Sequence, residues 1–295
     1  MAIKAIEIML DPGHDKAKYN KGAVPEYWEG AQMWRLYQFL RPSLERRGFI
    51  VAGTKSKCDQ SVNVVTRGRM ARSYDVFLSL HSNACADPAV DRPVGIYFVD
   101  DNCGAIDEES KELAKLLSET VAEVMGTRYP AQQYSQKSNR DRDGDGKKND
   151  DYYGMLYGCH QVGVPGIILE HSFHTNPEAA QWLMDDDNLR RLAEAEADAL
   201  AEYYGMVVIK DTTPPIIKKE EFDVKVPVLR RGDKGPEVKA MQRHLIGYGH
   251  SCGSSGADGS FGPATEKALK AYQKAHGLEQ DGVRGPATFK SMNGL

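Results

Sequence analysis

Short apolar runs separated by longer segments of helical periodicity make up the first 205 residues of the chain. The apolar runs predict β-strands at residues 5–10, 49–54, 76–81, 95–99 and 166–170. The longer segments predict helices at residues 28–47, 62–73, 108–125, 176–185 and 188–204. Strands that alternate with helices indicate an α/β architecture, and we expect a mixed sheet flanked by helices.

The pattern changes at residues 206–227. This stretch holds Thr-Thr-Pro-Pro at 212–215 and Lys-Lys-Glu-Glu at 218–221. Paired prolines beside a run of charges are typical of a semi-rigid, exposed linker. We therefore divide the chain into a first domain over residues 1–205, a linker over 206–227 and a second domain over 228–295.

The second domain contains an internal repeat. Asp-Gly-Ser-Phe-Gly-Pro-Ala-Thr at 258–265 recurs as Asp-Gly-Val-Arg-Gly-Pro-Ala-Thr at 281–288. The glycines and the proline predict a tight turn in each copy, and we expect the threonine to cap the helix that follows. With helices at 236–248 and 266–276, the pattern predicts a small three-helix domain that carries no recognisable catalytic set.

Charge and hydropathy exclude two classes of partner. The net charge of −4 argues against nucleic acid, because general binders of polyanions carry a basic surface. No apolar run approaches the ~20 residues that a membrane-spanning helix requires. We therefore expect neither nucleic-acid binding nor membrane insertion.

The N-terminus and the cysteines bear on the compartment. The first ten residues alternate and lead into Asp-Pro-Gly, as a first strand does, rather than forming a signal peptide. The five cysteines are widely spaced and include no Cys-x-x-Cys pair, which favours free thiols over disulfides. Both features predict a protein that is cytoplasmic as synthesised.

Four polar residues follow or border the predicted strands and the first long helix. His14 comes in a turn after the first strand, Glu29 at the start of the helix, and His81 and Glu170 at the ends of two apolar strands. Two neutral imidazoles and one carboxylate form a catalytic zinc set that leaves one coordination position open. A further carboxylate is what such a site needs as a general base. Glu26, three residues before Glu29, is an alternative ligand.

Several other polar residues have a structural interpretation at least as good as a functional one. We expect His171 and His174 to lie in the loop after the fifth strand and His160 to be structural. Asn83 would either orient His81 or contact the substrate, or it would cap a turn. The histidines of the second domain, His244, His250 and His276, are expected on its surface or in its packing.

An aspartate-rich segment at 139–151 resembles the opening of a calcium loop. Asp141, Asp143, Asp145 and Gly146 match its first positions, but Tyr152 stands where a bidentate glutamate is required. We favour an exposed loop over a calcium site.

Extended motifs around the four polar residues resemble one family. They are Leu-Asp-Pro-Gly-His at 10–14, a glutamate before an amphipathic helix that ends in Arg-Gly-Phe, Asp-Val-Phe-Leu-Ser-Leu-His-Ser-Asn-Ala at 75–84, and Val-Pro-Gly-Ile-Ile-Leu-Glu-His-Ser-Phe-His-Thr-Asn-Pro at 164–177. Over residues 3–204 the chain is similar to the zinc-dependent N-acetylmuramoyl-L-alanine amidases of the Amidase_3 type. The second domain resembles the peptidoglycan-binding domain 1 family in residues 229–242 and in both copies of the repeat.

The resemblance implies a peptidoglycan hydrolase with Zn²⁺ bound by His14, Glu29 and His81, and with Glu170 as the catalytic carboxylate. Its substrate would be the amide between N-acetylmuramic acid and the L-alanine of the stem peptide, cleaved by zinc-activated water. Without an export signal, it would be an endolysin-like or sporulation enzyme that acts on the cell wall after release. The alternatives are a zinc peptidase that cuts stem peptides and a non-catalytic cell-wall-binding protein.

Overall fold

The computed structural model describes residues 5–99, 105–142, 144, 146–206 and 228–293. The chain divides into two compact units between Met206 and Val207. All of the predicted linker except Met206 lies outside the described residues.

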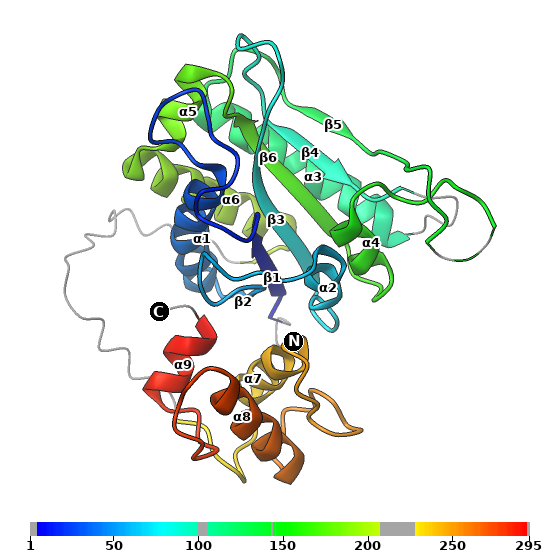
Figure 1. The fold of residues 1–295 in the computed structure, drawn as a ribbon, viewed down its shortest axis with the longest axis vertical. Coiled ribbons are helices and arrows are strands. Elements are labelled where there is room, and N and C mark those ends of the chain that lie inside the picture. The colour runs from blue at the N-terminus through cyan, green and yellow to red at the C-terminus, as the bar shows by residue number, and fades with distance from the viewer. Residues whose placement is uncertain (1–4, 100–104, 143, 145, 207–227, 294–295) are drawn as a thin grey trace. The chain divides into compact units, whose positions relative to one another are not determined.

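A six-stranded mixed sheet forms the centre of the first unit, with helices on both of its faces (Figure 1). Its strands, in chain order, are β1 (Glu7–Pro12), β2 (Ile50–Gly53), β3 (Val76–Asn83), β4 (Val94–Tyr97), β5 (Gln132–Tyr134) and β6 (Gly166–Phe173). Their order across the sheet is β2-β1-β3-β6-β4-β5, and only the β4–β6 pair is antiparallel. The predicted fold class is therefore confirmed, although β5 is too short to leave a periodic signal in the sequence.

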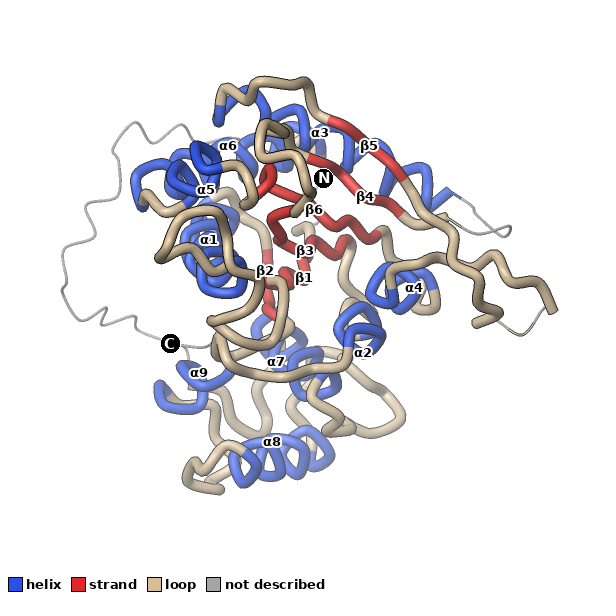
Figure 2. The backbone as a smooth tube through the Cα atoms, turned by 45° about the horizontal axis from the view of Figure 1, so that its top comes forward, coloured by secondary structure: helices blue, strands red, loops and turns tan. Residues whose placement is uncertain are grey.

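The helices of this unit surround the strands, as Figure 2 shows. They are α1 (Glu29–Arg46), α2 (Val64–Arg69), α3 (Ala105–Met125), α4 (Gly154–His160), α5 (Pro177–Leu183) and α6 (Asp186–Tyr203). The sequence pattern missed α4, which is short and contains two glycines, residues of low helix propensity. A Cβ on Gly158 would lie 2.3 Å from the Val65 carbonyl oxygen, and one on Gly68 would lie 2.0 Å from that of Met155. Gly68 of α2 and Gly158 of α4 thus let the backbones of the two helices pack against each other.

Strand register separates the two faces of the sheet. A Cβ on Gly166 would meet Cys159 of α4, so the face that carries Gly166 and, four residues on, Glu170 lies toward α4. A Cβ on Gly95, which pairs with Leu169, would instead meet Ala114 of α3. The helix α3 therefore covers the face opposite to Glu170.

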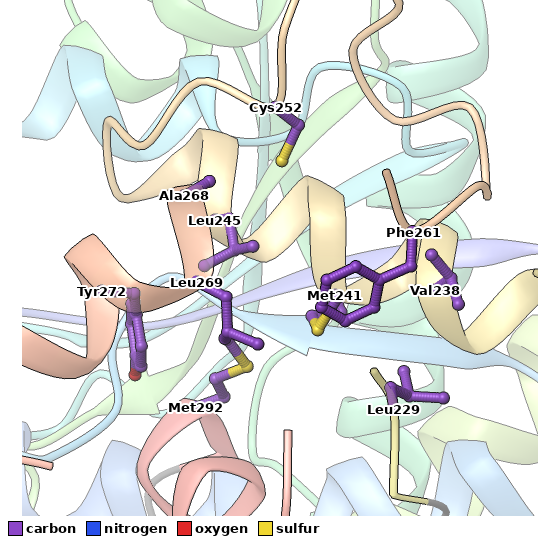
Figure 3. Packing of buried hydrophobic residues seen from close by; sticks show 10 residues of the cluster. All are labelled: Leu229, Val238, Met241, Leu245, Cys252, Phe261, Ala268, Leu269, Tyr272 and Met292. Carbon is purple, nitrogen blue, oxygen red and sulfur yellow. The ribbon is translucent and has the colours of Figure 1, made fainter. Parts of the chain in front are cut away.

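The second unit is built from α7 (Pro236–Gly247), α8 (Pro263–Ala275) and α9 (Pro286–Asn293). Its apolar core draws on all three helices, on the loop between α7 and α8, and on the segment before α7 (Figure 3). The members are Leu229, Val238, Met241, Leu245, Cys252, Phe261, Ala268, Leu269, Tyr272 and Met292. The predicted three-helix domain is confirmed.

Each copy of the repeat is held by one buried glutamine. Gln242 donates to Asp258, to a backbone carbonyl and to Thr265, and accepts the N–H of the repeat's Gly259 at 2.7 Å. Gln273 makes the same four contacts in the second copy. The expectation that the threonines cap the helices is wrong, because Thr265 is the third residue of α8 and its hydroxyl accepts from Gln242.

The described cysteines, Cys58, Cys85, Cys159 and Cys252, are free thiols, as predicted. No helix in the described part of the chain combines the length and the apolar character needed to cross a membrane.

Candidate metal centre and active site

His14 lies in the turn that follows β1, at the carboxyl end of the strand. Its backbone is left-handed, with a φ of 60°, which is uncommon for a residue with a side chain. Gly13 donates its N–H to the Leu80 carbonyl at 2.9 Å, and a Cβ on Gly13 would lie 2.5 Å from the same oxygen. The buried side chain of Lys55 donates to the carbonyls of Gly13 and His14. These contacts hold the turn against β3 and place the His14 ring 4.8 Å from the ring of His81, centroid to centroid.

A buried carboxylate fixes the strand from which this turn leaves. Asp11 accepts hydrogen bonds from Arg67 of α2, at 3.2 and 3.1 Å, and from the hydroxyls of Thr54 and Ser79, at 2.5 and 2.6 Å. Burial alone would raise the pKa of Asp11, but the charge of Arg67 and the two hydroxyls lower it below its ordinary value. The ionised carboxylate therefore ties β1 to β3 and α2.

Glu29, the first residue of α1, brings its carboxylate to both histidines. Its Oε1 lies 2.8 Å from His14 Nε2 and 3.0 Å from His81 Nδ1, and it also accepts the N–H of Ser82 at 3.0 Å. Its Oε2 accepts from the side-chain amide of Asn20 at 2.7 Å. Among the described residues, His14, Glu29 and His81 are the one group of three metal-ligating side chains whose ligand atoms all lie within 4.8 Å of one another.

The protonation states of His81 and Glu29 fit a divalent metal ion. Burial lowers the pKa of His81, which keeps its ring neutral. Burial raises the pKa of Glu29, but the neighbouring imidazoles outweigh it and lower that pKa below its ordinary value. The Nε2 atom of His81 is buried without a hydrogen-bond partner among the described residues, whereas that of His14 lies 2.8 Å from Glu29 Oε1. Neutral imidazoles and an ionised carboxylate are the forms that bind metal.

Glu170 lies on β6, directly opposite His81 in the register of the parallel β3–β6 pair, so both side chains leave the same face of the sheet. Its side chain is partly exposed, yet its Oε2 atom is buried without a hydrogen-bond partner in the described part of the chain. Burial and the charge of Glu29 raise the pKa of Glu170 well above its ordinary value. A carboxyl group of this kind is suited to accept a proton and to return it.

The structure thus brings together the four residues that the sequence singled out, His14, Glu29, His81 and Glu170. The alternative ligand Glu26 is exposed and does not belong to the group.

The sequence did not reveal the side chains that support the group. The Tyr27 hydroxyl lies 2.7 Å from that of Ser82, and His174 Nδ1 lies 2.9 Å from the Ser82 carbonyl. Ser82 also donates its backbone N–H to Glu29, so this cluster fixes the carboxylate from the side of β3. Asn20, the other donor to Glu29, has a left-handed backbone with a φ of 49°. Ser82 and His174 lie within the motifs at 75–84 and 164–177, but neither motif predicts these contacts, because the residues meet only through tertiary structure.

Of the other predictions about single residues, some agree with the structure and one is wrong. The prediction for His171 is wrong, because β6 extends to Phe173 and His171 lies within the strand; His174 does follow it. Asn83 ends β3 and accepts the N–H of Ala84 at 2.8 Å. His160 stacks on Phe98, with 4.1 Å between ring centroids, as a packing residue does. The histidines of the second unit, His244, His250 and His276, lie in ring contacts with its tyrosines.

The aspartate-rich segment has the features of a loop. Asp143 and Asp145 lie outside the described residues. Asp141 accepts the backbone N–H groups of two glycines of the loop, at 2.7 and 3.1 Å. Asp151 accepts the backbone N–H groups of Val99 and Tyr153, at 2.9 and 2.6 Å. Tyr152, at the position of the missing glutamate, is exposed. The described carboxylates therefore order the backbone here.

Two family models match the chain. The model for N-acetylmuramoyl-L-alanine amidase, Amidase_3, matches residues 8–202, and a model described as a putative peptidoglycan binding domain matches residues 234–292.

Curated relatives match parts of the chain. N-acetylmuramoyl-L-alanine amidase CwlL of Bacillus licheniformis is 46% identical over 136 residues, which cover 45% of this chain and 36% of CwlL. The zinc D-Ala-D-Ala carboxypeptidase of Streptomyces albus G is 41% identical over 64 residues, which cover 22% of this chain and 25% of that protein. The chain therefore spans about a third or less of the length of these relatives.

Solved structures share the fold of the first unit. The catalytic domain of the amidase CwlV from Paenibacillus polymyxa superposes with a TM-score of 0.54 at 18% identity, over 68% of this chain and 99% of that domain. An N-acetylmuramoyl-L-alanine amidase from Clostridium difficile 630 gives 0.55 at 19% identity, over 68% and 97%.

Proposed function

The chain belongs to the Amidase_3 family of N-acetylmuramoyl-L-alanine amidases, and from this premise we propose that it hydrolyses the amide between N-acetylmuramic acid and the L-alanine of the peptidoglycan stem peptide. The observation that carries the proposal is the placement of His14, Glu29 and His81 beside Glu170 at the end of neighbouring strands. The three-ligand set is the one expected of a catalytic zinc site.

We infer that His14, Glu29 and His81 would hold Zn²⁺. When bound, zinc would supply a Lewis acid that polarises the scissile carbonyl and makes water more acidic. Asn20 and the backbone of Ser82 keep the Glu29 carboxylate in place for this role, as outer partners of metal ligands do.

Glu170 then handles the proton. It takes a proton from the attacking water as the new carbon–oxygen bond forms at the lactyl carbonyl. It returns that proton to the alanine nitrogen as the carbon–nitrogen bond breaks, so that the amine leaves neutral. The raised pKa of Glu170 favours the first step, because a carboxylate of higher pKa is a stronger base.

We propose that the second domain, residues 228–295, binds peptidoglycan. It would thereby hold the domain of residues 1–205 at its polymeric substrate. Its match to a peptidoglycan-binding family supports this role. A tethered binding module raises the concentration of the enzyme at an insoluble polymer without any new contact in the active site.

Digestion of purified peptidoglycan, with and without a zinc chelator, tests the proposal. Mass spectrometry should find intact stem peptides that begin with a free L-alanine amine, and the chelator should abolish their release. Peptides shortened at an internal bond would identify a zinc peptidase instead. Binding to the wall with no product in either condition would identify a binding protein.

A further inference from the structure

Two buried ionisable side chains lie behind the metal-ligand candidate His81. His171 follows Glu170 in β6 and therefore points to the opposite face of the sheet, toward α6. Its Nδ1 atom lies 2.9 Å from the His81 carbonyl oxygen, and its Nε2 atom lies 2.9 Å from Glu196 Oε1 of α6. Both side chains are 0% exposed. Because a carbonyl oxygen can only accept, His171 donates its Nδ1–H to the backbone of His81.

The sheet is irregular at this point. The β3–β6 register shifts between His81 and Asn83, and Ser172 has a left-handed backbone with a φ of 81°. The Ser172 hydroxyl donates to Asp91 at 2.7 Å and holds that conformation. Strained backbone that the surroundings fix in this way is common at functional sites. At such an irregularity the bond from His171 defines the position of the His81 carbonyl.

Stability of the fold does not account for the pair. Burial of a histidine and a glutamate removes both from water, and apolar residues of similar volume in place of such a pair are often neutral or stabilising. Glu196 Oε2 is also buried with no hydrogen-bond partner among the described residues. The pair therefore calls for a role other than packing.

We propose that His171 and Glu196 are positioning residues for the active site. Glu196 orients the ring of His171, and His171 holds the backbone of His81, so that the spacing between His81 and Glu170 is fixed. Glu170 and His171 are consecutive in β6, so one short segment both presents the catalytic carboxylate and holds the ligand opposite it. The inference rests on the proposed function. The hydrogen bond from His171 reaches the backbone of the proposed metal ligand His81, whereas outer partners of metal ligands usually bind the imidazole ring.

The double variant His171→Leu/Glu196→Leu separates positioning from stability. It removes both ionisable groups together and leaves neither one buried alone. We expect a melting temperature equal to or above that of the wild type, a zinc affinity lower by ~10- to 100-fold in competition with a chelator, and a similar fall in kcat with little change in KM. A cobalt-substituted sample should show an altered d–d spectrum. A folded double variant with wild-type zinc affinity, spectrum and kcat would overturn the proposal.

Two single variants cover the case in which the double variant does not fold. Glu196→Gln leaves His171 a hydrogen-bond partner and should keep zinc affinity near that of the wild type, whereas Glu196→Ala should lower it. Equal zinc affinity in folded Glu196→Ala and wild type would contradict the proposal.

A matched control is His160→Leu/Asp107→Leu, which removes another histidine–carboxylate pair of this unit, with His160 Nδ1 3.4 Å from Asp107 Oδ1. It should leave zinc affinity unchanged. Absence of zinc binding in the wild type would refute the proposed function, whereas equal binding by wild type and variants would refute only the positioning role.

Discussion

The two glutamines of the second unit and the site residues of the first unit differ in how completely their buried polar atoms are hydrogen-bonded. In the second unit, Gln242 and Gln273 each use their whole carboxamide, with every donor and acceptor directed at the same positions of a repeated turn. In the first unit, His81 and Glu170 each keep a buried atom that has no hydrogen-bond partner among the described residues. Because an unsatisfied buried polar atom costs free energy, its retention points to a ligand or a reaction. The hydrogen-bonded glutamines hold the repeat together, whereas the unpaired atoms of His81 and Glu170 lie where a metal ion and a substrate are expected.

The largest effect is expected where the unsatisfied group does chemistry. Glu170→Gln keeps the shape of the side chain but removes its capacity to accept and return a proton. We expect a loss of about 10²- to 10⁴-fold in kcat on purified peptidoglycan, with zinc content unchanged by metal analysis. If the variant lost its metal as well, Glu170 would be a metal ligand and not the general base.

A smaller set of variants tests which carboxylate belongs to the metal group. Glu29→Ala should abolish stoichiometric zinc binding, because it removes the one carboxylate that lies between the two histidines. Glu26→Ala is the matched control, three residues away and exposed, and should bind zinc as the wild type does. Isothermal titration of the metal-free proteins with zinc measures both. Equal binding by the two variants would remove Glu29 from the site.

The fully hydrogen-bonded glutamines, Gln242 and Gln273, should matter for the stability of the fold and not for catalysis. Gln242→Ala leaves the Gly259 N–H and the Thr265 hydroxyl without their partner and should destabilise the second unit by roughly 1–3 kcal/mol. Gln273→Ala should act alike, because its contacts are the same. Urea denaturation of the full chain measures the change, and zinc binding should be unaffected. A catalytic defect with unchanged stability would contradict the comparison.

Most of the fold could be read from the sequence, because the strands and helices of the first unit have clear periodicity. The exceptions are short. The strand β5 has three residues, and α4 is a seven-residue helix whose two glycines disfavour it locally. Both form because neighbouring elements supply their packing, for example the close approach of Gly68 and Gly158. Helix and strand propensities depend on the local sequence and therefore do not predict such contacts.

The sequence by itself determined the candidate residues His14, Glu29, His81 and Glu170, because each comes at the end of a strand or the start of a helix, and parallel strands end at a common edge. Only the tertiary structure decided that Glu29, rather than Glu26, lies between the histidines, and that His171 turns away from the site to meet Glu196. The physical reason is that strand ends follow from local periodicity. The direction of a side chain depends on register, and its partner depends on a segment distant in sequence.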